Sequence, residues 1–319
     1  MRLKARLSLG IFLSLICSVL ALSPALAAPG TVLKIGDQKG AERALMTAAG
    51  VLDHVPYRIE WDVFASAQAL LEALNAGAID TGGVGDGPFL FAYAARSPIK
   101  VVAVYHSDVG ESVAIVVPKN STIRSAADLK GHTIGTTRGS IGHFLLLKAL
   151  AQAKLTPRDV TVAFLDPGSA KAAMESGSID AWSTWDPYVA LAQVQDRARV
   201  AVSSKNLLPG YGYQAASNGA IAGKRAVLDD FLNRLAKARR WAMAHKEAYA
   251  AVWAKETGLP QSVAQLALGR QNYAPVPIDD RVVSALGQAA GVYRAAGVIA
   301  DVPGIPAAFD KSFNDAYVP

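Results

Sequence analysis

The stretch GAIDTGGVGD at residues 77–86 is repeated as GSIDAWSTWD at residues 177–186. The repeated positions are a glycine, an isoleucine and two aspartates: Gly77, Ile79, Asp80 and Asp86, then Gly177, Ile179, Asp180 and Asp186. Upstream, IGDQKG at 35–40 recurs as IGTTRG at 134–139. Two repeats in the same order, 99 or 100 residues apart, predict that the chain contains two related halves.

Both halves alternate short apolar runs, typical of strands, with amphipathic runs, typical of helices. Strands are expected at 32–36, 57–64, 78–84, 101–106, 132–137, 160–165 and 179–184, and helices at 41–49, 66–77, 86–95, 143–153, 169–177 and 186–194. After about residue 220 the pattern is largely helical. This order predicts an α/β fold of mostly parallel sheets with helices on both faces.

The first 27 residues have the features of a secretory signal. Arg2, Lys4 and Arg6 precede an apolar run, and a small-residue cleavage site ends at Ala27. The run is short for a membrane span and no paired arginine precedes it, so we expect general export and cleavage near Ala27. The single cysteine, Cys17, lies within this signal. The mature chain is therefore expected to have no disulfide, no thiolate metal site and no cysteine nucleophile.

Charge and motif content exclude several classes of function. Removing the three basic signal residues lowers the net charge from +6 to +3, and no run of five basic residues exists, so nucleic acid is not an expected partner. The chain has no phosphate-binding loop, no GxSxG and no H-x-x-x-H spacing among its five histidines. We therefore expect no metal, no cofactor and no enzymatic activity.

The repeated phrases lie where a strand ends and a helix begins. At this edge of a parallel sheet, helix N-termini present unpaired N–H groups and the positive end of the helix dipole, which favours anions. Four such ends contribute about 2–6 kcal/mol, and a micromolar ligand needs about 8 kcal/mol. A ligand with an organic tail closes that gap by burying apolar surface.

Some residues near these edges have two interpretations. Candidate walls for the tail are Trp182, Trp185, Tyr188, Tyr211 and Tyr213, with core packing as the alternative for each. Lys39 and Arg138 either contribute to the anion site or are surface charges exposed to solvent. Asp86 and Asp186 either contact the ligand or cap the helices that follow them.

Four stretches resemble the aliphatic sulfonate-binding proteins, the periplasmic receptors of ABC importers, in the wider group that contains the taurine and nitrate receptors. They are QKG at 38–40, LLEALNAGAIDTGGVGDGP at 70–88, SAADLKGHTIGTTRGS at 125–140 and GSIDAWSTWDPY at 177–188. The resemblance covers nearly the whole mature chain. It implies a clamp of the type II periplasmic binding protein kind, with residues 28–117 and 218–319 as one domain, 118–217 as the other, and the ligand cleft between them.

The resemblance also implies the binding residues and the partners. Positions that match cleft residues of the family are Gln38, Gly85, Asp86, Gly139, Ser140, Trp185 and Asp186. Arg138 stands where relatives usually carry a basic residue, and His143 is a further candidate whose alternative is a packing role. The implied partners are a small organosulfonate and an ABC permease at the inner membrane, with the receptor acting as a periplasmic monomer.

Departures from the family pattern leave the ligand open. Asp37 replaces a usual tyrosine, Val84 a usual threonine, and Phe89 a usual second proline. The alternatives are taurine, an aromatic sulfonate, a sulfate ester, nitrate or another anion. A desulfinase-like enzyme on the same fold is disfavoured, because those enzymes use a cysteine nucleophile. A sensor that docks on a membrane receptor instead of a transporter is a third possibility.

Overall fold

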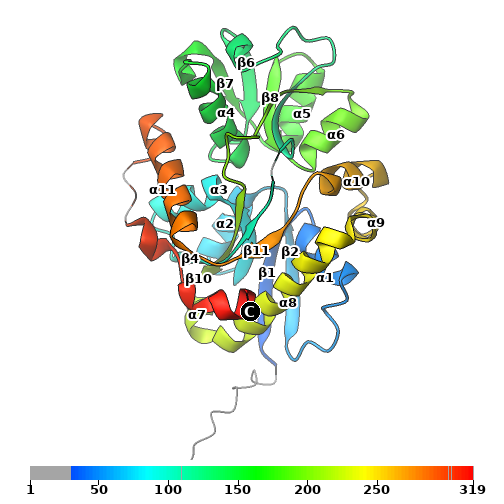
Figure 1. Cartoon of the computed structure of the whole chain (residues 1–319), viewed down its shortest axis with the longest axis vertical. Coiled ribbons are helices and arrows are strands. Elements are labelled where there is room, and N and C mark those ends of the chain that lie inside the picture. The colour runs from blue at the N-terminus through cyan, green and yellow to red at the C-terminus, as the bar shows by residue number, and fades with distance from the viewer. Residues whose placement is uncertain (1–29, 109, 301, 303, 319) are drawn as a thin grey trace, which may run out of the picture.

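The computed structural model describes residues 30–108, 110–300, 302 and 304–318. The expected signal, its cleavage position near Ala27 and Cys17 all lie outside these residues. The described chain forms two β-sheets with helices packed on both sides (Figure 1). This is the α/β architecture that the sequence predicts. None of the described helices is both long enough and apolar enough to cross a bilayer.

The first sheet has six strands in the order β11-β4-β10-β3-β1-β2. They are β1 (Val32–Gln38), β2 (Arg58–Phe64), β3 (Thr81–Gly85), β4 (Ile99–His106), β10 (Tyr211–Ser217) and β11 (Ala274–Val276). β1 pairs in parallel with β2 and β3, whereas β10 and β11 pair antiparallel. The sheet is therefore mixed, with a parallel core.

The second sheet has five strands in the order β7-β6-β8-β5-β9. They are β5 (Val113–Val117), β6 (Thr133–Thr136), β7 (Thr161–Phe164), β8 (Ala181–Trp185) and β9 (Arg199–Ser203). β6 pairs in parallel with β7 and β8, and β5 pairs antiparallel with β8 and β9. The two sheets thus share the same arrangement of parallel strands.

Helices connect the parallel strands and continue beyond them. In the first half these are α1 (Ala41–Ala48), α2 (Ala67–Asn75) and α3 (Asp86–Ala94), and in the second α4 (Ile141–Gln152), α5 (Pro167–Glu175) and α6 (Tyr188–Gln195). The C-terminal region adds α7 (Asn218–Gly223), α8 (Arg225–Ala244), α9 (Lys246–Thr257), α10 (Gln261–Gly269), α11 (Asp280–Ala295) and α12 (Asn314–Tyr317). Short 3-10 turns lie at Ala127–Leu129, Pro157–Asp159, Ile305–Ala308 and Lys311–Phe313.

The isoleucine of the repeated phrase packs into a glycine gap in each sheet. A Cβ added to Gly36 in β1 would lie 2.5 Å from Cδ1 of Ile79, and one added to Gly135 in β6 would lie 2.5 Å from Cδ1 of Ile179. Both isoleucines are almost fully buried. Close packing against these isoleucines therefore requires glycine at positions 36 and 135.

The first aspartate of the phrase has the same structural role in each half. Asp80 Oδ2 accepts a hydrogen bond from the backbone N–H of Lys34, and Asp180 Oδ2 accepts one from that of Thr133, both at 2.8 Å. Each bond ties the start of a central strand to the loop before its neighbour. Much of the repeat is therefore explained by the fold, and not by the ligand.

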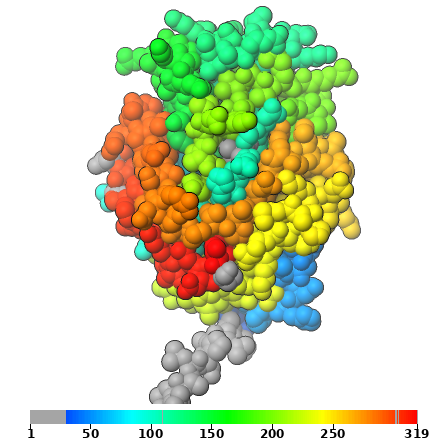
Figure 2. Space-filling model, viewed as in Figure 1, coloured from blue at the N-terminus to red at the C-terminus, as the bar shows by residue number. Residues whose placement is uncertain are grey.

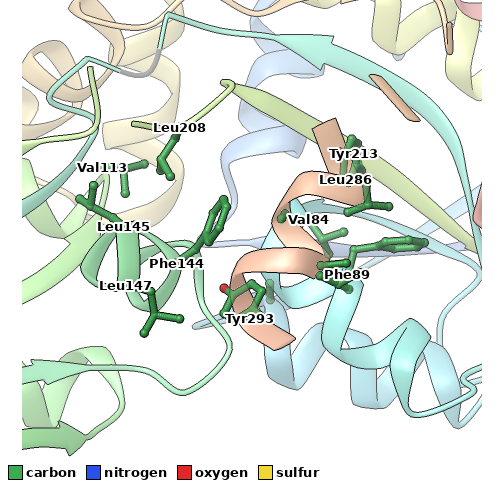
Figure 3. Packing of buried hydrophobic residues seen from close by; sticks show 14 of the residues in the cluster. Val84, Phe89, Val113, Phe144, Leu145, Leu147, Leu208, Tyr213, Leu286 and Tyr293 are labelled. Carbon is green, nitrogen blue, oxygen red and sulfur yellow. The ribbon is translucent and has the colours of Figure 1, made fainter. Parts of the chain in front are cut away.

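A shared apolar core joins the two halves through α11. Figure 3 shows Tyr293 of α11 beside Phe144 of α4, and their ring centroids lie 5.2 Å apart. Phe91 of α3 packs against Tyr293 at 5.1 Å from the opposite half. The Tyr293 hydroxyl donates a hydrogen bond to the carbonyl oxygen of Ser140 at 3.1 Å. The C-terminal helix therefore packs against both halves.

The chain crosses between the sheets twice. It leaves the first sheet after His106 and enters the second at Val113, then leaves after Ser203 and returns at Tyr211. Both crossings precede the boundaries expected from the sequence, so that β5 belongs to the second sheet and β10 to the first. The division into two domains stays a prediction, and we propose that its boundaries lie at these crossings.

Candidate ligand cavity

A cavity of about 210 Å³ lies between the two sheets. In Figure 2 the teal and green residues of the second half form the upper lobe, above the blue residues of the first half and the yellow, orange and red residues of the C-terminal region. The cavity walls come from loops that follow strands and from the first turns of helices in both halves. The strand ends that the sequence identified as the binding edge therefore do meet around one space.

Five of the nine predicted site residues line this cavity: Gln38, Gly85, Ser140, Trp185 and Asp186. Gln38 is the last residue of β1 and donates from its amide to the carbonyl oxygen of Gly83 at 2.7 Å. Ser140 caps α4, because its Oγ accepts from the backbone N–H of His143 at 3.0 Å. These contacts hold the side chains in place before any ligand arrives.

The other four predicted residues, Asp86, Arg138, Gly139 and His143, are not part of the cavity wall. Asp86 is 2% exposed and accepts from its neighbour Gly87, and burial raises its pKa to about 6. The Arg138 guanidinium lies over the ring of Phe164, 3.7 Å from its centroid. Gly139 adopts a φ of 71°, the left-handed region that favours glycine. Asp86 therefore belongs to the first turn of α3, whereas Arg138, Gly139 and His143 belong to the turn before α4 and to its first residues.

His143 is buried and bonded to the same loop. Its Nδ1 accepts the backbone N–H of Gly139 at 3.2 Å, which requires the neutral ring. Burial, aided by the nearby charge of Arg138, lowers the His143 pKa to about 4. The structure thus places His143 in the packing role that was the alternative to ligand contact.

A pH prediction follows from His143. Its folded pKa lies below the ordinary value of about 6.5, so the unfolded chain binds more protons between pH 6.5 and 4. Lowering the pH through this window should cost the wild type roughly 3 kcal/mol of unfolding free energy relative to His143→Gln. Urea unfolding of both proteins at several pH values measures the difference. A difference that does not change with pH contradicts the buried neutral imidazole.

Two helix N-termini are open at the cavity, one from each half. Ala67 and Gln68 of α2 line it from the first half, and Ser140 and Ile141 line it at the start of α4. Within the described part of the chain, the backbone N–H groups of Ala67, Gln68, Ile141 and Gly142 have no hydrogen-bond acceptor. Such ends attract anions through their free N–H groups and helix dipole.

Carboxylates already occupy the N-termini of two other helices. Asp37 Oδ1 and Oδ2 accept from the backbone N–H groups of Glu42 and Arg43 of α1, at 3.0 and 2.9 Å. Asp186 Oδ1 accepts from Ala190 of α6 at 3.0 Å. The sequence predicts up to four helix ends around one anion, those that follow the repeated phrases at the starts of α1, α3, α4 and α6. The ends of α1 and α6 are closed to an anion, and the open end of α2 is not one of the four.

Asp186 is held by an arginine from the C-terminal helices. Arg270, just after α10, donates to Asp186 through Nε at 2.9 Å and through Nη2 at 2.7 Å. It also donates to Gln193 of α6 at 2.8 Å. Burial raises the Asp186 pKa, and the Arg270 hydrogen bonds oppose that effect. The pair connects the helices beside the first sheet to the end of β8 in the second.

Sequence reasoning missed most of the polar wall of the cavity. Glu42, Arg239 and Gln271 line it beside Tyr105 and Tyr273. They come from α1, α8 and the loop after α10, where no repeat or motif marked them. One indication of this wall is present in the sequence: Asp37 and Glu42 are five residues apart across the start of α1, which places two acids near each other.

The aromatic candidates divide between wall and core. Trp185 and Tyr211 line the cavity. Trp182 and Tyr213 are 1% and 0% exposed and belong to the packed core. Tyr188 bridges the halves, since its hydroxyl donates to the carbonyl oxygen of Ala65 at 2.8 Å. Lys39 lines the cavity and places Nζ 5.5 Å from the Tyr188 ring centroid.

No metal-binding arrangement stands out in the described residues: no group of three or more histidine, cysteine, aspartate or glutamate side chains is placed to hold an ion. The chemistry of the cavity instead rests on backbone N–H groups, a few buried charges and aromatic rings. These features favour reversible recognition of a charged organic solute.

Comparison with known proteins places the chain in a family. Residues 64–249 match the NMT1/THI5 like family. An aliphatic sulfonates-binding protein of Escherichia coli K12 is 36% identical over 234 residues, which are 72% of this chain and 73% of that protein.

Solved structures agree with this match. The alkanesulfonate-binding protein SsuA from Xanthomonas axonopodis pv. citri, bound to MOPS, superposes with a TM-score of 0.82 and 31% identity, covering 89% of this chain and 99% of that one. The desulfurization enzyme DSZB shares the fold alone, with a TM-score of 0.65 and 19% identity, covering 90% of this chain and 98% of that one. The chain therefore belongs to the NMT1/THI5-like family, among its aliphatic sulfonate-binding proteins.

Proposed function

We propose that this protein is the periplasmic solute-binding component of an ABC importer and that it captures an organosulfonate for sulfur supply. The observation that carries the proposal is the pair of open helix N-termini, α2 from one half and α4 from the other, at one cavity. A sulfonate has three oxygens that accept hydrogen bonds, and N–H groups from two directions suit it. The names of the relatives support this ligand class.

The binding step is noncovalent. The anionic head group lies between the first turns of α2 and α4, and the organic part lies against aromatic side chains such as Trp185 and Tyr211. The ligand makes its contacts with both halves at once when the halves have closed around it. The liganded, closed protein is then the form that the permease recognises, as a monomer in the periplasm.

An enzyme on the same fold is the second candidate, because DSZB shares the fold. The described part of the chain offers no cysteine nucleophile to its cavity. The relatives at 31% and 36% identity are named as binding proteins. These observations favour capture over catalysis.

Calorimetric titration of the mature protein, unfolded and refolded to remove bound solute, tests the proposal. The ligands are short and long alkanesulfonates, an aromatic sulfonate, taurine, sulfate and nitrate. We expect at least one organosulfonate to bind with a Kd of about 1 µM or lower, and the inorganic ions to give no heat. Binding of nitrate or sulfate alone, or of no sulfonate, contradicts the proposed function.

A further inference from the structure

Two cationic side chains, Lys39 and Arg239, belong to the described wall of the cavity. The charge of Arg239 is compensated, because its Nη2 lies 3.3 Å from Glu42 Oε2. Within the described part of the chain, Lys39 has no such partner: no carboxylate pairs with its Nζ and no acceptor binds it. Instead, Nζ lies 5.5 Å from the centroid of the Tyr188 ring. Lys39 thus brings to the cavity a positive charge that an anionic ligand can compensate.

The acids of the cavity wall are engaged elsewhere. Glu42 forms the ion pair just described, and both carboxylate oxygens of Asp37 accept from backbone N–H groups of α1. Asp186 accepts from Arg270 at 2.7 Å. Because these carboxylates have other partners, the ammonium of Lys39 is available to an anion that enters the cavity.

The backbone of Lys39 adopts a conformation that lysine avoids. Its φ is 54° and that of Gly40 is 66°, so two successive residues lie in the left-handed region, for which Asn-Gly is the favoured sequence. Arg96, Lys154 and Arg197 also have positive φ, but each of them follows the C-terminus of a helix, where this conformation is common. Lys39 instead lies between β1 and α1. A strained lysine at a cavity wall points to a requirement for its side chain.

Contacts with two other elements hold this turn. The backbone N–H of Lys39 donates to the carbonyl oxygen of Phe64 in β2 at 3.0 Å, and the carbonyl oxygen of Lys39 accepts from Trp253 Nε1 in α9 at 2.9 Å. Gly40 has no room for a side chain, since an added Cβ would lie 2.8 Å from Thr257 Cγ2. The surrounding structure therefore stabilises the strained conformation and fixes the point from which the Lys39 side chain extends.

The turn also places Lys39 beside the open N-terminus of α2. Phe64, which accepts the Lys39 N–H, is the last residue of β2, and Ala67 begins α2 three residues later. Between them, the carbonyl oxygen of Ala65 accepts from the Tyr188 hydroxyl at 2.8 Å. Tyr188 thus contacts both the Lys39 ammonium and the segment that leads into α2. An anion at the first turn of α2 is therefore close to this ammonium.

We propose that Lys39 binds the anionic head group of the ligand and that the strained turn at Lys39 and Gly40 positions its ammonium for this contact. The inference rests on the proposed function and adds a residue to it. The helix N-termini supply only partial charges, whereas the ammonium supplies a full charge and a charge-assisted hydrogen bond. Because the ammonium also faces Tyr188 of the second half, the head group, Lys39 and Tyr188 meet where the two halves meet.

Lys39→Asn tests the inference, because it removes the charge and suits the backbone. Asparagine adopts the left-handed conformation more readily than lysine, so the midpoint of urea unfolding should stay at the wild-type value or rise. Affinity for the alkanesulfonates and the aromatic sulfonate of the titration series should fall at least about tenfold, the effect of losing a hydrogen bond from a charged group. The factor should be the same for each sulfonate, because the head group is common to all.

Salt distinguishes an ion pair from a purely structural role. Raising sodium chloride from about 0.02 M to about 0.5 M screens the attraction between ammonium and sulfonate. The difference in affinity between wild type and Lys39→Asn should therefore become smaller at high salt. Lys39→Arg keeps the charge but replaces the compact ammonium with a planar group, so its affinity should lie between those of wild type and Lys39→Asn.

Lys154→Asn is the matched control. Lys154 has a φ of 58°, is exposed and follows the C-terminus of α4, outside the cavity wall. The substitution removes the same charge and relieves the same kind of backbone strain as Lys39→Asn. It should leave the affinity for every sulfonate at the wild-type value.

The possible outcomes are distinguishable. If Lys39→Asn binds the sulfonates within about threefold of wild type, the inference is overturned and the sulfonate receptor stays intact. A loss that varies with tail length, that is unchanged by salt, or that accompanies a lower urea midpoint also overturns it, since the lysine then acts on the tail or on the fold. If wild type itself binds no sulfonate, the proposed function is wrong, and this inference with it.

Discussion

Replacing Arg270 with alanine is expected to weaken ligand binding about a hundredfold. The change leaves Asp186, whose side chain is 3% exposed, without its bidentate partner. Removing one member of a buried ion pair costs about 3–5 kcal/mol, and the lower end applies here because the Arg270 side chain is 15% exposed. About 3 kcal/mol corresponds to a loss of roughly two orders of magnitude in affinity.

The loss should be seen in binding because the pair joins the two halves. Arg270 follows α10 beside the first sheet, whereas Asp186 follows β8 in the second. Without the pair, the form that holds both halves around the ligand is less populated, and the apparent affinity falls by the same factor. Calorimetric titration with the best sulfonate ligand measures this effect. Arg270→Lys keeps the charge but not the paired geometry, so it should lie between wild type and alanine.

A surface arginine provides the control. Arg281 pairs with Asp279, its side chain is 84% exposed, and exposed pairs contribute little. Arg281→Ala should therefore bind ligand as the wild type does. If Arg270→Ala loses less than about threefold in affinity, the buried pair does not hold the halves together.

Replacing Gly142 with alanine is expected to lower the free energy of unfolding by about 2–3 kcal/mol. Alanine in a helix normally stabilises by up to about 1 kcal/mol relative to glycine. At Gly142, however, the new Cβ would lie 2.5 Å from the carbonyl oxygen of Ser183 and 2.9 Å from its carbonyl carbon. These are backbone atoms of β8 inside the second sheet, so α4 must move away from the sheet.

The same substitution elsewhere should have the opposite sign. Gly287 lies within α11, and a Cβ there would meet nothing within 4 Å. Gly287→Ala should therefore raise the free energy of unfolding by about 0.5–1 kcal/mol. Chemical denaturation followed by circular dichroism compares the two variants with wild type. A stabilising Gly142→Ala would show that α4 does not lie this close to β8.

Moving α4 should also weaken ligand binding, because the first turn of α4 lines the cavity at Ser140 and Ile141. The affinity of Gly142→Ala for a sulfonate is thus expected to fall, while that of Gly287→Ala stays at the wild-type value. Comparing the two variants therefore distinguishes the effect of moving α4 from the general effect of replacing a helical glycine with alanine.

Most of the fold could be predicted because local sequence patterns encode it. The strands β1 to β4 and β6 to β8 each overlap a segment expected from periodicity, and their ends differ from the expected ones by at most three residues. The four strands that were not anticipated, β5, β9, β10 and β11, all pair antiparallel. They lie outside the repeated units, and antiparallel pairing across the crossings depends on partners far away in the chain.

The candidate site was predicted less completely. Gln38, Gly85, Ser140, Trp185 and Asp186 line the cavity, as their places at strand ends imply. The sequence could not tell which helix ends stay open. That depends on where carboxylates such as Asp37 point, and such contacts are made in three dimensions.

The sequence by itself determined the two α/β halves, the strand-end location of the cavity and membership of the sulfonate-binding family. Periodicity and short motifs carry this information because strands and helices form from neighbouring residues. The tertiary structure alone decided the charge of the cavity. Arg239, Arg270 and Gln214 lie 84 to 197 residues from the acids they contact, and only folding brings them within hydrogen-bond distance.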